Sequence, residues 1–473
     1  MNRRTFQRLL VGSSLSWEAR FGKAAQSGTR YEPTWNSLNR HQPPAWYQDA
    51  KLGIFIHWGL YSVPAWAPTT GELGKVDWKK WFRDNPYAEW YLNTLRIKGS
   101  PTYEHHVKTY GPEFDYYQFM PMFRQAHAKW DPASWAELFK KTHARYAVLT
   151  TKHHDGFTLW PSETPNPKTA GKRYASDRDL VGELTKAVRA AGLKMGLYYS
   201  GGLDWTFTSE PIVDRQSLMA RVPQSEEYAR YADAHYRELI RRYEPAVLWN
   251  DISYPKAGKI PELFADYYNA VPDGVIDNRF GVEFSDFTTP EYAKYDEITK
   301  KKWEACRGLG FSFGYNQNEG ADVVIAADKL IALLIDVVSK NGNLLLNIGP
   351  KADGTISQIQ MDRLNKLGAW LDVNGEGIFG TRPWIRAEGG SGNPDARFTE
   401  RSGTLYAFLL QPHSMKSFTI PGITALEGTK VHILGQSKPS AWKQEGQDLR
   451  ITSGEPAMSP YAVGLRVHPA PRA

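Results

Sequence analysis

The chain has 473 residues, of which 41% are hydrophobic and 23% are charged, so its composition is that of an ordinary globular protein with room for one large and one smaller domain. Its net charge is +7, but lysine and arginine are interspersed with acidic residues, which argues against a nucleic-acid-binding surface. The single cysteine, Cys306, excludes an intrachain disulfide and a cysteine-based metal site, and no run of 18 apolar residues is present to span a membrane.

Residues 1–26 are similar to an export signal. The pair Arg3 and Arg4 precedes a short apolar run, residues 9–17, and this order resembles a twin-arginine signal. We therefore expect an exported protein, in the periplasm or outside the cell. The alternative is a basic arm without fixed structure on a cytoplasmic protein. Residues 27–45, which contain three prolines, are predicted to be a connecting arm.

From residue 131 onward, an amphipathic helix followed by a short apolar strand recurs five times. The five pairs are 131–144 with 145–151, 177–192 with 193–200, 225–243 with 245–251, 260–274 with 275–279, and 328–342 with 343–350. This alternation predicts an α/β fold with a parallel sheet and right-handed crossovers. An open doubly wound sheet and a (β/α)8 barrel both satisfy the pattern. No glycine-rich phosphate turn follows a strand, and the length of 46–384 suits a barrel with insertions.

After residue 384 the pattern changes to short strands separated by glycine, proline and serine. The predicted strands are 404–410, 416–420, 429–435, 448–452 and 462–468. Residues 385–473 are therefore predicted to form a separate all-β domain, a small sandwich.

The carboxyl ends of the predicted barrel strands carry polar or aromatic residues. In a barrel these ends converge on the face that carries the chemistry. They bear His57 and Trp58, then His153, His154 and Asp155, then Tyr198 and Tyr199, then Asp251, and finally Arg279. One such residue more often caps a helix or satisfies a loop, but five strand ends of this kind together indicate a site.

Metal and serine chemistry are the weaker explanations of these residues. His57, His153, His154 and Asp251 are of metal-ligand types, and a metal-dependent hydrolase that uses the strand-end histidines is one alternative. However, adjacent histidines in an extended strand face opposite sides, and no His-x-x-x-His pair is present. Ser200 lacks the Gly-x-Ser-x-Gly elbow of a serine nucleophile. We therefore expect no metal and no other cofactor.

A pair of carboxylates explains the residues better. Asp251 ends the segment "AVLWND". Cleavage of a glycosidic bond needs a carboxylate and a carboxylic acid beside the anomeric carbon, about 5 Å apart if configuration is retained. The candidate partners of Asp251 are Glu283, Glu291, Glu304 and Glu319. The remaining strand-end residues would then bind sugar hydroxyls and stack on the sugar ring.

Several motifs occur in an order that resembles the alpha-L-fucosidases of glycoside hydrolase family 29. These are "GIFIHWG", "YAEWY", "TTKHHDGF", "YYSGGLDW", "LWND" and "GNLLLNIGPKADGTI", all between residues 45 and 384. The resemblance implies a (β/α)8-like barrel followed by a β-sandwich. It also implies a retaining exo-glycosidase that hydrolyses terminal alpha-L-fucosyl residues of a fucosylated glycan by double displacement through a covalent fucosyl-enzyme.

The same resemblance assigns roles to individual residues. Asp251 falls on the nucleophile, and Glu291, in "TTPEY", falls on the acid/base. Positions in the fucose pocket are occupied by His57, Glu89, Trp90, His153, His154, Tyr198, Trp249, Arg279 and Phe313. Because strand side chains alternate, only one of Tyr198 and Tyr199 can face the barrel interior, and Tyr198 is the one expected. A fucose-binding module without turnover is the remaining alternative, and the presence of both carboxylates argues against it.

Overall fold

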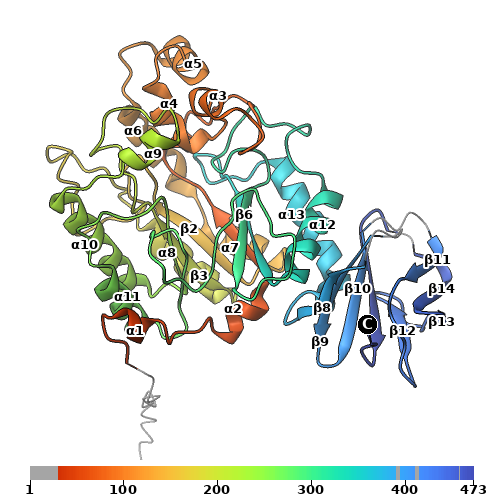
Figure 1. Ribbon diagram of the computed structural model, residues 1–473. Coiled ribbons are helices and arrows are strands. Elements are labelled where there is room, and N and C mark those ends of the chain that lie inside the picture. The colour runs from red at the N-terminus through yellow and green to blue at the C-terminus, as the bar shows by residue number, and fades with distance from the viewer. Residues whose placement is uncertain (1–29, 390–394, 411–414, 458, 473) are drawn as a thin grey trace, which may run out of the picture. The chain divides into compact units, whose positions relative to one another are not determined.

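The computed structural model describes residues 30–389, 395–410, 415–457 and 459–472 (Figure 1). The predicted export signal, residues 1–26, lies outside the described residues. Seven strands form one parallel sheet in the order β5-β4-β3-β2-β1-β7-β6. They are β1 (Leu52–Ile56), β2 (Tyr146–Lys152), β3 (Lys194–Tyr199), β4 (Val247–Asn250), β5 (Val275–Ile276), β6 (Trp303–Gly308) and β7 (Gly342–Ile348).

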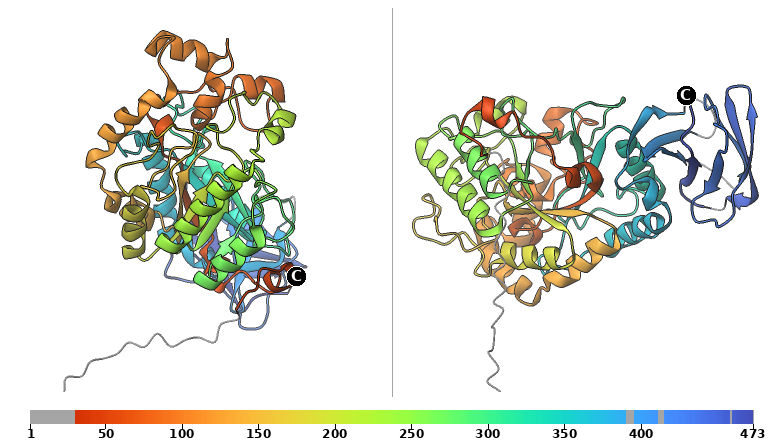
Figure 2. Two further views of the ribbon diagram at one scale, coloured as in Figure 1. Left: turned by 90° about the vertical axis from the view of Figure 1, so that its left-hand side faces the viewer. Right: turned by 90° about the horizontal axis from the view of Figure 1, so that it is seen from below.

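Helices surround this curved sheet: the crossover helices lie along its outer face, and a group of mostly short helices lies at one end of it (Figures 1 and 2). Those in the described residues are α1 (Trp35–Leu38), α2 (Ala45–Ala50), α3 (Trp78–Arg83), α4 (Tyr91–Leu95), α5 (Pro101–Tyr110), α6 (Phe119–Ala126), α7 (Pro132–Lys141), α8 (Leu180–Ala190), α9 (Arg215–Ala220), α10 (Glu226–Tyr243), α11 (Ile260–Ala270), α12 (Ala327–Ser339) and α13 (Gln358–Asn374). None of these is long and apolar enough to cross a membrane. The helices between β1 and β2, α3 to α6, were absent from the prediction because they are short and lack a long apolar period.

The crossover helices begin at side-chain caps and bury one face. Asp131 accepts a hydrogen bond from the backbone N–H of Ala133 at the start of α7, and Ser225 does the same for Tyr228 at the start of α10. Such caps satisfy backbone donors that a helix leaves unpaired at its first turn. On α8, Leu180, Leu184 and Val188 are fully buried, as their spacing of four residues predicts.

An extended segment, residues 286–292, closes the sheet into a barrel between its two edge strands. On one side, the backbone N–H of Asp286 donates to the carbonyl of Ile276 in β5 at 2.9 Å. On the other side, the N–H of Thr288 donates to the carbonyl of Lys302 at 3.2 Å, beside β6. The segment therefore occupies the eighth position of the ring, and the predicted (β/α)8-like barrel is confirmed. It also carries Glu291.

Two antiparallel sheets follow the barrel and enclose a second apolar core, which confirms the predicted sandwich. The larger sheet has the order β12-β15-β10-β9-β8 and the smaller has β11-β14-β13. Their strands are β8 (Arg382–Glu388), β9 (Ala396–Arg401), β10 (Thr404–Leu409), β11 (Met415–Ile420), β12 (Lys430–Ile433), β13 (Ala441–Glu445), β14 (Asp448–Ala457) and β15 (Val463–His468).

The structure adds detail at two places in the predicted domain division. The boundary after residue 384 falls inside β8, because this strand starts at Arg382 and already pairs with β9. The described part of the predicted arm, residues 27–45, packs against the barrel. There, Nδ1 of His41 lies 2.7 Å from Oδ1 of Asp286, and the His41 ring stacks on Tyr268 at 3.9 Å between centroids. A buried hydrogen bond and a stacked ring hold this stretch in place, and sequence composition gives no sign of either.

Candidate active site

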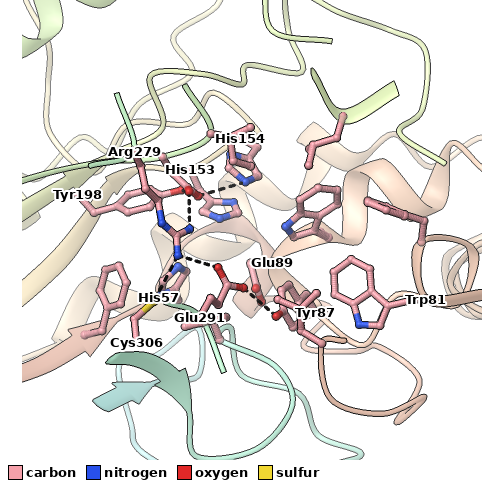
Figure 3. Close-up of a pocket in the computed structure, with 18 of the residues that line it drawn as sticks. His57, Trp81, Tyr87, Glu89, His153, His154, Tyr198, Arg279, Glu291 and Cys306 are labelled. Atoms are coloured by element: carbon pink, nitrogen blue, oxygen red, sulfur yellow. Dashed lines mark hydrogen bonds and ion pairs between the residues drawn. The ribbon is translucent and has the colours of Figure 1, made fainter. Parts of the chain in front are cut away.

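The carboxyl ends of the barrel strands surround a cavity of about 260 Å³ (Figure 3). Its lining includes every residue predicted for the site: His57, Glu89, Trp90, His153, His154, Tyr198, Trp249, Asp251, Arg279, Glu291 and Phe313. These residues are spread over more than half of the chain, and the parallel topology brings them to one face of the barrel.

Asp251 follows the last residue of β4 and is 8% exposed. Its Oδ2 accepts a hydrogen bond from the Tyr198 hydroxyl at 2.9 Å, and its Oδ1 accepts one from Nη1 of Arg279 at 2.8 Å. The backbone carbonyl of Asp251 accepts the N–H of Gly202 at 2.9 Å, so the loop after β3 supports the loop after β4. The carboxylate is therefore oriented on both oxygens and still reaches the cavity.

Arg279 connects the two candidate catalytic carboxylates. While Nη1 binds Asp251, Nη2 donates to Oε2 of Glu291 at 3.0 Å, and Nε donates to Oγ1 of Thr289 at 2.9 Å. The guanidinium lies 4.6 Å over the ring of Trp249. A planar guanidinium with donors in fixed directions holds both carboxylates in one geometry. It also offsets part of the repulsion between them.

Glu291 has a second donor on its other oxygen. The Tyr87 hydroxyl donates to Oε1 of Glu291 at 2.9 Å (Figure 3). Burial raises the pKa of Tyr87 well above its usual value, so this hydroxyl remains protonated and serves as a donor. The Glu291 side chain is 22% exposed, which leaves it open to the cavity.

His57 is held as a neutral ring that offers an acceptor to the cavity. Its Nδ1 lies 2.7 Å from Oδ1 of Asn347, and Nδ2 of Asn347 donates to the carbonyl of Phe313 at 2.6 Å. This fixes the amide so that Nδ1 of His57 carries the proton. Burial lowers the pKa of His57 to about 3, so Nε2 keeps a free lone pair.

The same reasoning applies to His154. Its Nδ1 lies 2.6 Å from Oγ of Ser200, whose own hydroxyl donates to the carbonyl of Leu203 at 2.7 Å. Nδ1 is therefore the protonated nitrogen, and Nε2 is an acceptor 3.8 Å from Oδ2 of Asp251. Burial lowers the pKa of His154 well below its usual value.

Both adjacent histidines reach the cavity because the backbone turns after β2. The strand ends at Lys152, and the rings of His153 and His154 lie only 3.9 Å apart. The argument that they face opposite sides therefore does not hold, since it assumes an extended backbone. Within the described residues, no group of three His, Cys, Asp or Glu side chains is arranged to hold a metal ion.

Glu89 lies in the cavity as a buried carboxyl. Its Oε2 accepts hydrogen bonds from the N–H of Gly314 at 2.7 Å and from Oγ of Ser312 at 3.2 Å. Burial raises the pKa of Glu89 to about 8 in spite of these bonds. At neutral pH the group is mainly a carboxylic acid, which can donate as well as accept.

The other glutamates considered as partners of Asp251 lie elsewhere. Glu304 sits inside the barrel beneath the cavity and accepts hydrogen bonds from Trp249, Tyr47 and Tyr146. Glu319 is partly buried and accepts hydrogen bonds from the backbone N–H groups of residues 311 and 312, and Glu283 is exposed outside the cavity. Tyr199 also points away, because its hydroxyl contacts Nδ1 of His235 on α10 at 3.1 Å.

Three functional contacts were missed by sequence reasoning. Tyr87 binds Glu291, Cys306 lies 3.4 Å from Nη2 of Arg279, and Glu304 orients the indole of Trp249. Tyr87 lies two residues before Glu89 in the motif "YAEWY". Its place in that motif could have indicated that Tyr87 belongs to the site. Alternation along β6 would have placed Glu304 and Cys306 together on the inner face of the barrel.

Comparisons with known proteins agree on one family. The family model described as Alpha-L-fucosidase matches residues 19–376. The alpha-L-fucosidase of Dictyostelium discoideum is 35% identical over 400 residues, which cover 81% of each chain. A solved alpha-L-fucosidase structure is 46% identical, with a TM-score of 0.87 over 93% of this chain and all of the other. The Thermotoga maritima alpha-fucosidase, solved with fucose and with a mechanism-based inhibitor, is 44% identical, with a TM-score of 0.84 over 93% of this chain and 100% of that one.

Proposed function

The chain belongs to the alpha-L-fucosidase family and is a glycoside hydrolase, and from this premise we propose that it removes terminal alpha-L-fucosyl residues from fucosylated glycans with retention of configuration. The observation that carries the proposal is the pair of carboxylates bound to the two arms of Arg279. Related support comes from the Thermotoga maritima relative, which was solved with a mechanism-based inhibitor.

In the proposed mechanism, Asp251 is the nucleophile. Its carboxylate attacks the anomeric carbon while Glu291 gives a proton to the departing glycosidic oxygen, which leaves a covalent fucosyl-enzyme. Glu291 then takes a proton from the attacking water, and the bond to Asp251 breaks as the new C–O bond forms. Arg279 and Tyr198 hold the Asp251 carboxylate in one orientation before attack.

Recognition of fucose is assigned to the residues around this pair. Nε2 of His57 and Nε2 of His154 accept hydrogen bonds from sugar hydroxyls, because each ring is protonated on Nδ1. Phe313 offers an apolar surface to the C5 methyl group of fucose, a contact worth about 1 kcal/mol. Most discrimination therefore comes from hydroxyl contacts, since a wrong sugar leaves these buried polar groups unpaired.

The first experiment tests the activity and its independence of metal. The purified protein should release L-fucose from 4-nitrophenyl alpha-L-fucoside after exhaustive dialysis against EDTA. Proton NMR of the sugar H1 should show the alpha anomer as the first product. Loss of activity after dialysis, with recovery on zinc, would favour the metal-dependent alternative. Binding of fucose without any hydrolysis would favour a binding module.

The second experiment separates the roles of the two carboxylates. Asp251→Gly should lower kcat by at least ~10³-fold, because the covalent partner is lost. Azide can then occupy the space left beside the anomeric carbon, and the product should be beta-fucosyl azide, with inverted configuration. The absence of this product from an otherwise folded variant would contradict Asp251 as the nucleophile.

Azide should also rescue Glu291→Ala, but the product should have the opposite anomeric configuration. With a dinitrophenyl fucoside the fucosyl-enzyme should still form in an initial burst, because that leaving group needs no proton. Its breakdown should stall until azide, which needs no base, restores turnover and gives alpha-fucosyl azide. Wild-type turnover of Glu291→Ala on a poor leaving group would mean that Glu291 is not the acid/base.

A further inference from the structure

The cavity continues outward from Glu291 along a row of aromatic side chains that the proposed mechanism does not use. The row, defined here as Tyr87, Trp81 and Trp78, begins at the hydroxyl that donates to Glu291. Ring centroids of Tyr87 and Trp81 are 5.0 Å apart, and those of Trp81 and Trp78 are 6.0 Å apart. All three side chains belong to the stretch that contains α3 and its following loop.

The row lies on the leaving-group side of the site. A general acid must stand beside the glycosidic oxygen that it protonates. Glu291 has that role in the proposed function, and Figure 3 shows Tyr87 and then Trp81 on the side of Glu291 away from His153 and Tyr198. The portion of the substrate that departs from fucose must therefore lie along the row.

Trp81 supplies an independent sign of a ligand there. Its side chain lines the cavity and is 3% exposed, yet its indole Nε1–H is buried and has no hydrogen-bond partner among the described residues. A buried donor without a partner is costly. An oxygen of a bound sugar would satisfy it, and sugar rings also stack on indole faces.

Arg215 of α9 stands at the outer end of the row. Its guanidinium lies 3.8 Å over the ring of Trp78, and both residues line the cavity. Arg215 is exposed and forms no ion pair or hydrogen bond with the described residues. The neighbouring carboxylate of Asp214 is already engaged, because it caps α9 by accepting hydrogen bonds from Ser217. A cation that stacks on an indole and has no anionic partner among the described residues suits an anionic group.

We infer that the aromatic row and Arg215 form a binding site for an extended, acidic leaving portion of the substrate. This portion has at least two rings, which lie along Tyr87, Trp81 and Trp78, and its outer ring bears a carboxylate or sulfate that pairs with Arg215. The inference rests on the proposed function, since it takes Glu291 as the acid. It extends that function by naming the chemical class of glycan that the enzyme prefers.

The test compares fucosides that differ only in charge at the far end. The probes are 4′-carboxybiphenyl-4-yl and 4′-carbamoylbiphenyl-4-yl alpha-L-fucoside, with a 4′-sulfo analogue that separates sulfate-type from carboxylate recognition. The measured quantity is the ratio of kcat/KM for the charged probe to that for the neutral one. Comparing this ratio between wild type and variant cancels the intrinsic reactivity of the two leaving groups.

In Arg215→Gln the ratio should fall about fivefold for at least one anionic probe, the size of one partly exposed charge pair. In the wild-type enzyme the ratio should also fall as NaCl is raised, because salt screens the pair. Lys79→Gln is the matched control, since Lys79 is an exposed cation next to Trp78 on α3 that does not line the cavity. Trp81→Phe keeps an aromatic ring but removes the N–H, and should lower kcat/KM for a fucosyl disaccharide more than for the biphenyl probes.

Failure of the inference and failure of the proposed function have different results. If neither the biphenyl fucosides nor 4-nitrophenyl alpha-L-fucoside is hydrolysed, the proposed function is wrong. If they are hydrolysed but the ratio is the same in wild type and Arg215→Gln, or falls equally in Lys79→Gln, the inferred site is wrong.

Discussion

Glu89 is the residue in the cavity whose protonation bears most directly on binding. Burial raises its pKa to about 8, so it is an acid at neutral pH and becomes a carboxylate above pH 8. The hydrogen bonds from Gly314 and Ser312 both reach its Oε2. The protonated form can donate to a sugar hydroxyl from its Oε1, and the carboxylate cannot.

We therefore predict that kcat/KM falls above about pH 8, and that Glu89→Gln removes this alkaline decline. The amide keeps a donor at every pH. The measurement should use 2,4-dinitrophenyl alpha-L-fucoside, because that leaving group does not need Glu291 as an acid and its profile reports other groups. An unchanged alkaline limb in Glu89→Gln would show that a different group titrates there.

Lys51 illustrates a buried charge outside the cavity. Its side chain is fully buried at the start of β1, its Nζ has no hydrogen-bond partner among the described residues, and burial lowers its pKa to about 7. Between pH 7 and its ordinary value of 10.5 the unfolded chain binds a proton that the folded protein does not. The free energy of unfolding should therefore rise with pH across this window.

Lys51→Met should stabilise the protein, most strongly below pH 7, where the buried ammonium is charged. The gain should shrink as pH rises toward 10.5, because the lysine then becomes neutral in the unfolded chain as well. Urea unfolding at several pH values measures this, with Lys186→Met, on the exposed face of α8, as the control. A variant less stable than wild type at pH 6 would contradict the argument.

At the scale of elements, the loops after β3 and β4 are locked together at Gly202. A Cβ atom on Gly202 would lie 1.6 Å from the carbonyl oxygen of Ile252, which is backbone and cannot move as a side chain can. Its N–H also donates to the carbonyl of Asp251. The position of Asp251 is thus set by contact between two loops.

Gly202→Ala should move the Asp251 loop and lower kcat/KM at least about tenfold, because small displacements of a reacting group are costly. The effect on melting temperature should be comparatively modest. Gly375→Ala is the matched control: it has a helical φ of −61° and its added Cβ would make only ordinary contacts. Normal activity of Gly202→Ala would show that the two loops shift without consequence.

At the scale of the whole molecule, a buried ionic cluster joins the barrel to the C-terminal sheets. Asp336 of α12 accepts hydrogen bonds from Nε of Arg397 in β9 at 2.6 Å and from Nζ of Lys340 at 3.0 Å, and Lys340 also pairs with Glu388 in β8 at 2.8 Å. Burial acts to raise the pKa of Asp336, but the hydrogen bonds from Arg397 and the lysines outweigh it, and its pKa is lowered.

Asp336→Asn should destabilise the protein by about 3 kcal/mol, because Arg397 and Lys340 lose their most deeply buried anionic partner. Since the folded pKa lies below the ordinary value of 3.8, the stability that Asp336 contributes is present above pH 3.8 and is lost as pH falls through the folded pKa. The variant should therefore lose less stability on acidification than wild type. Asp362→Asn, which removes a surface pairing on α13, should change unfolding in urea little by comparison.

The sequence by itself determined the barrel, the sandwich and the residues at the strand ends. These follow from local patterns, such as the apolar face of α8 or the polar residues that close "AVLWND", and each needs only neighbours in the chain. The family motifs pointed to Asp251 and Glu291 in the same way, because each motif is a short stretch of neighbouring residues.

Only the tertiary structure decided which of these residues touch. Residues 286–292 lack a strand pattern because their partners, β5 and β6, supply the hydrogen bonds that hold them. Tyr87 meets Glu291 across 204 positions of the chain, and the turn after Lys152 brings His153 and His154 to one side. Contacts of this kind depend on how distant segments pack, and burial then sets the pKa of Glu89 and Lys51. Neither packing nor burial is a property of the residues alone.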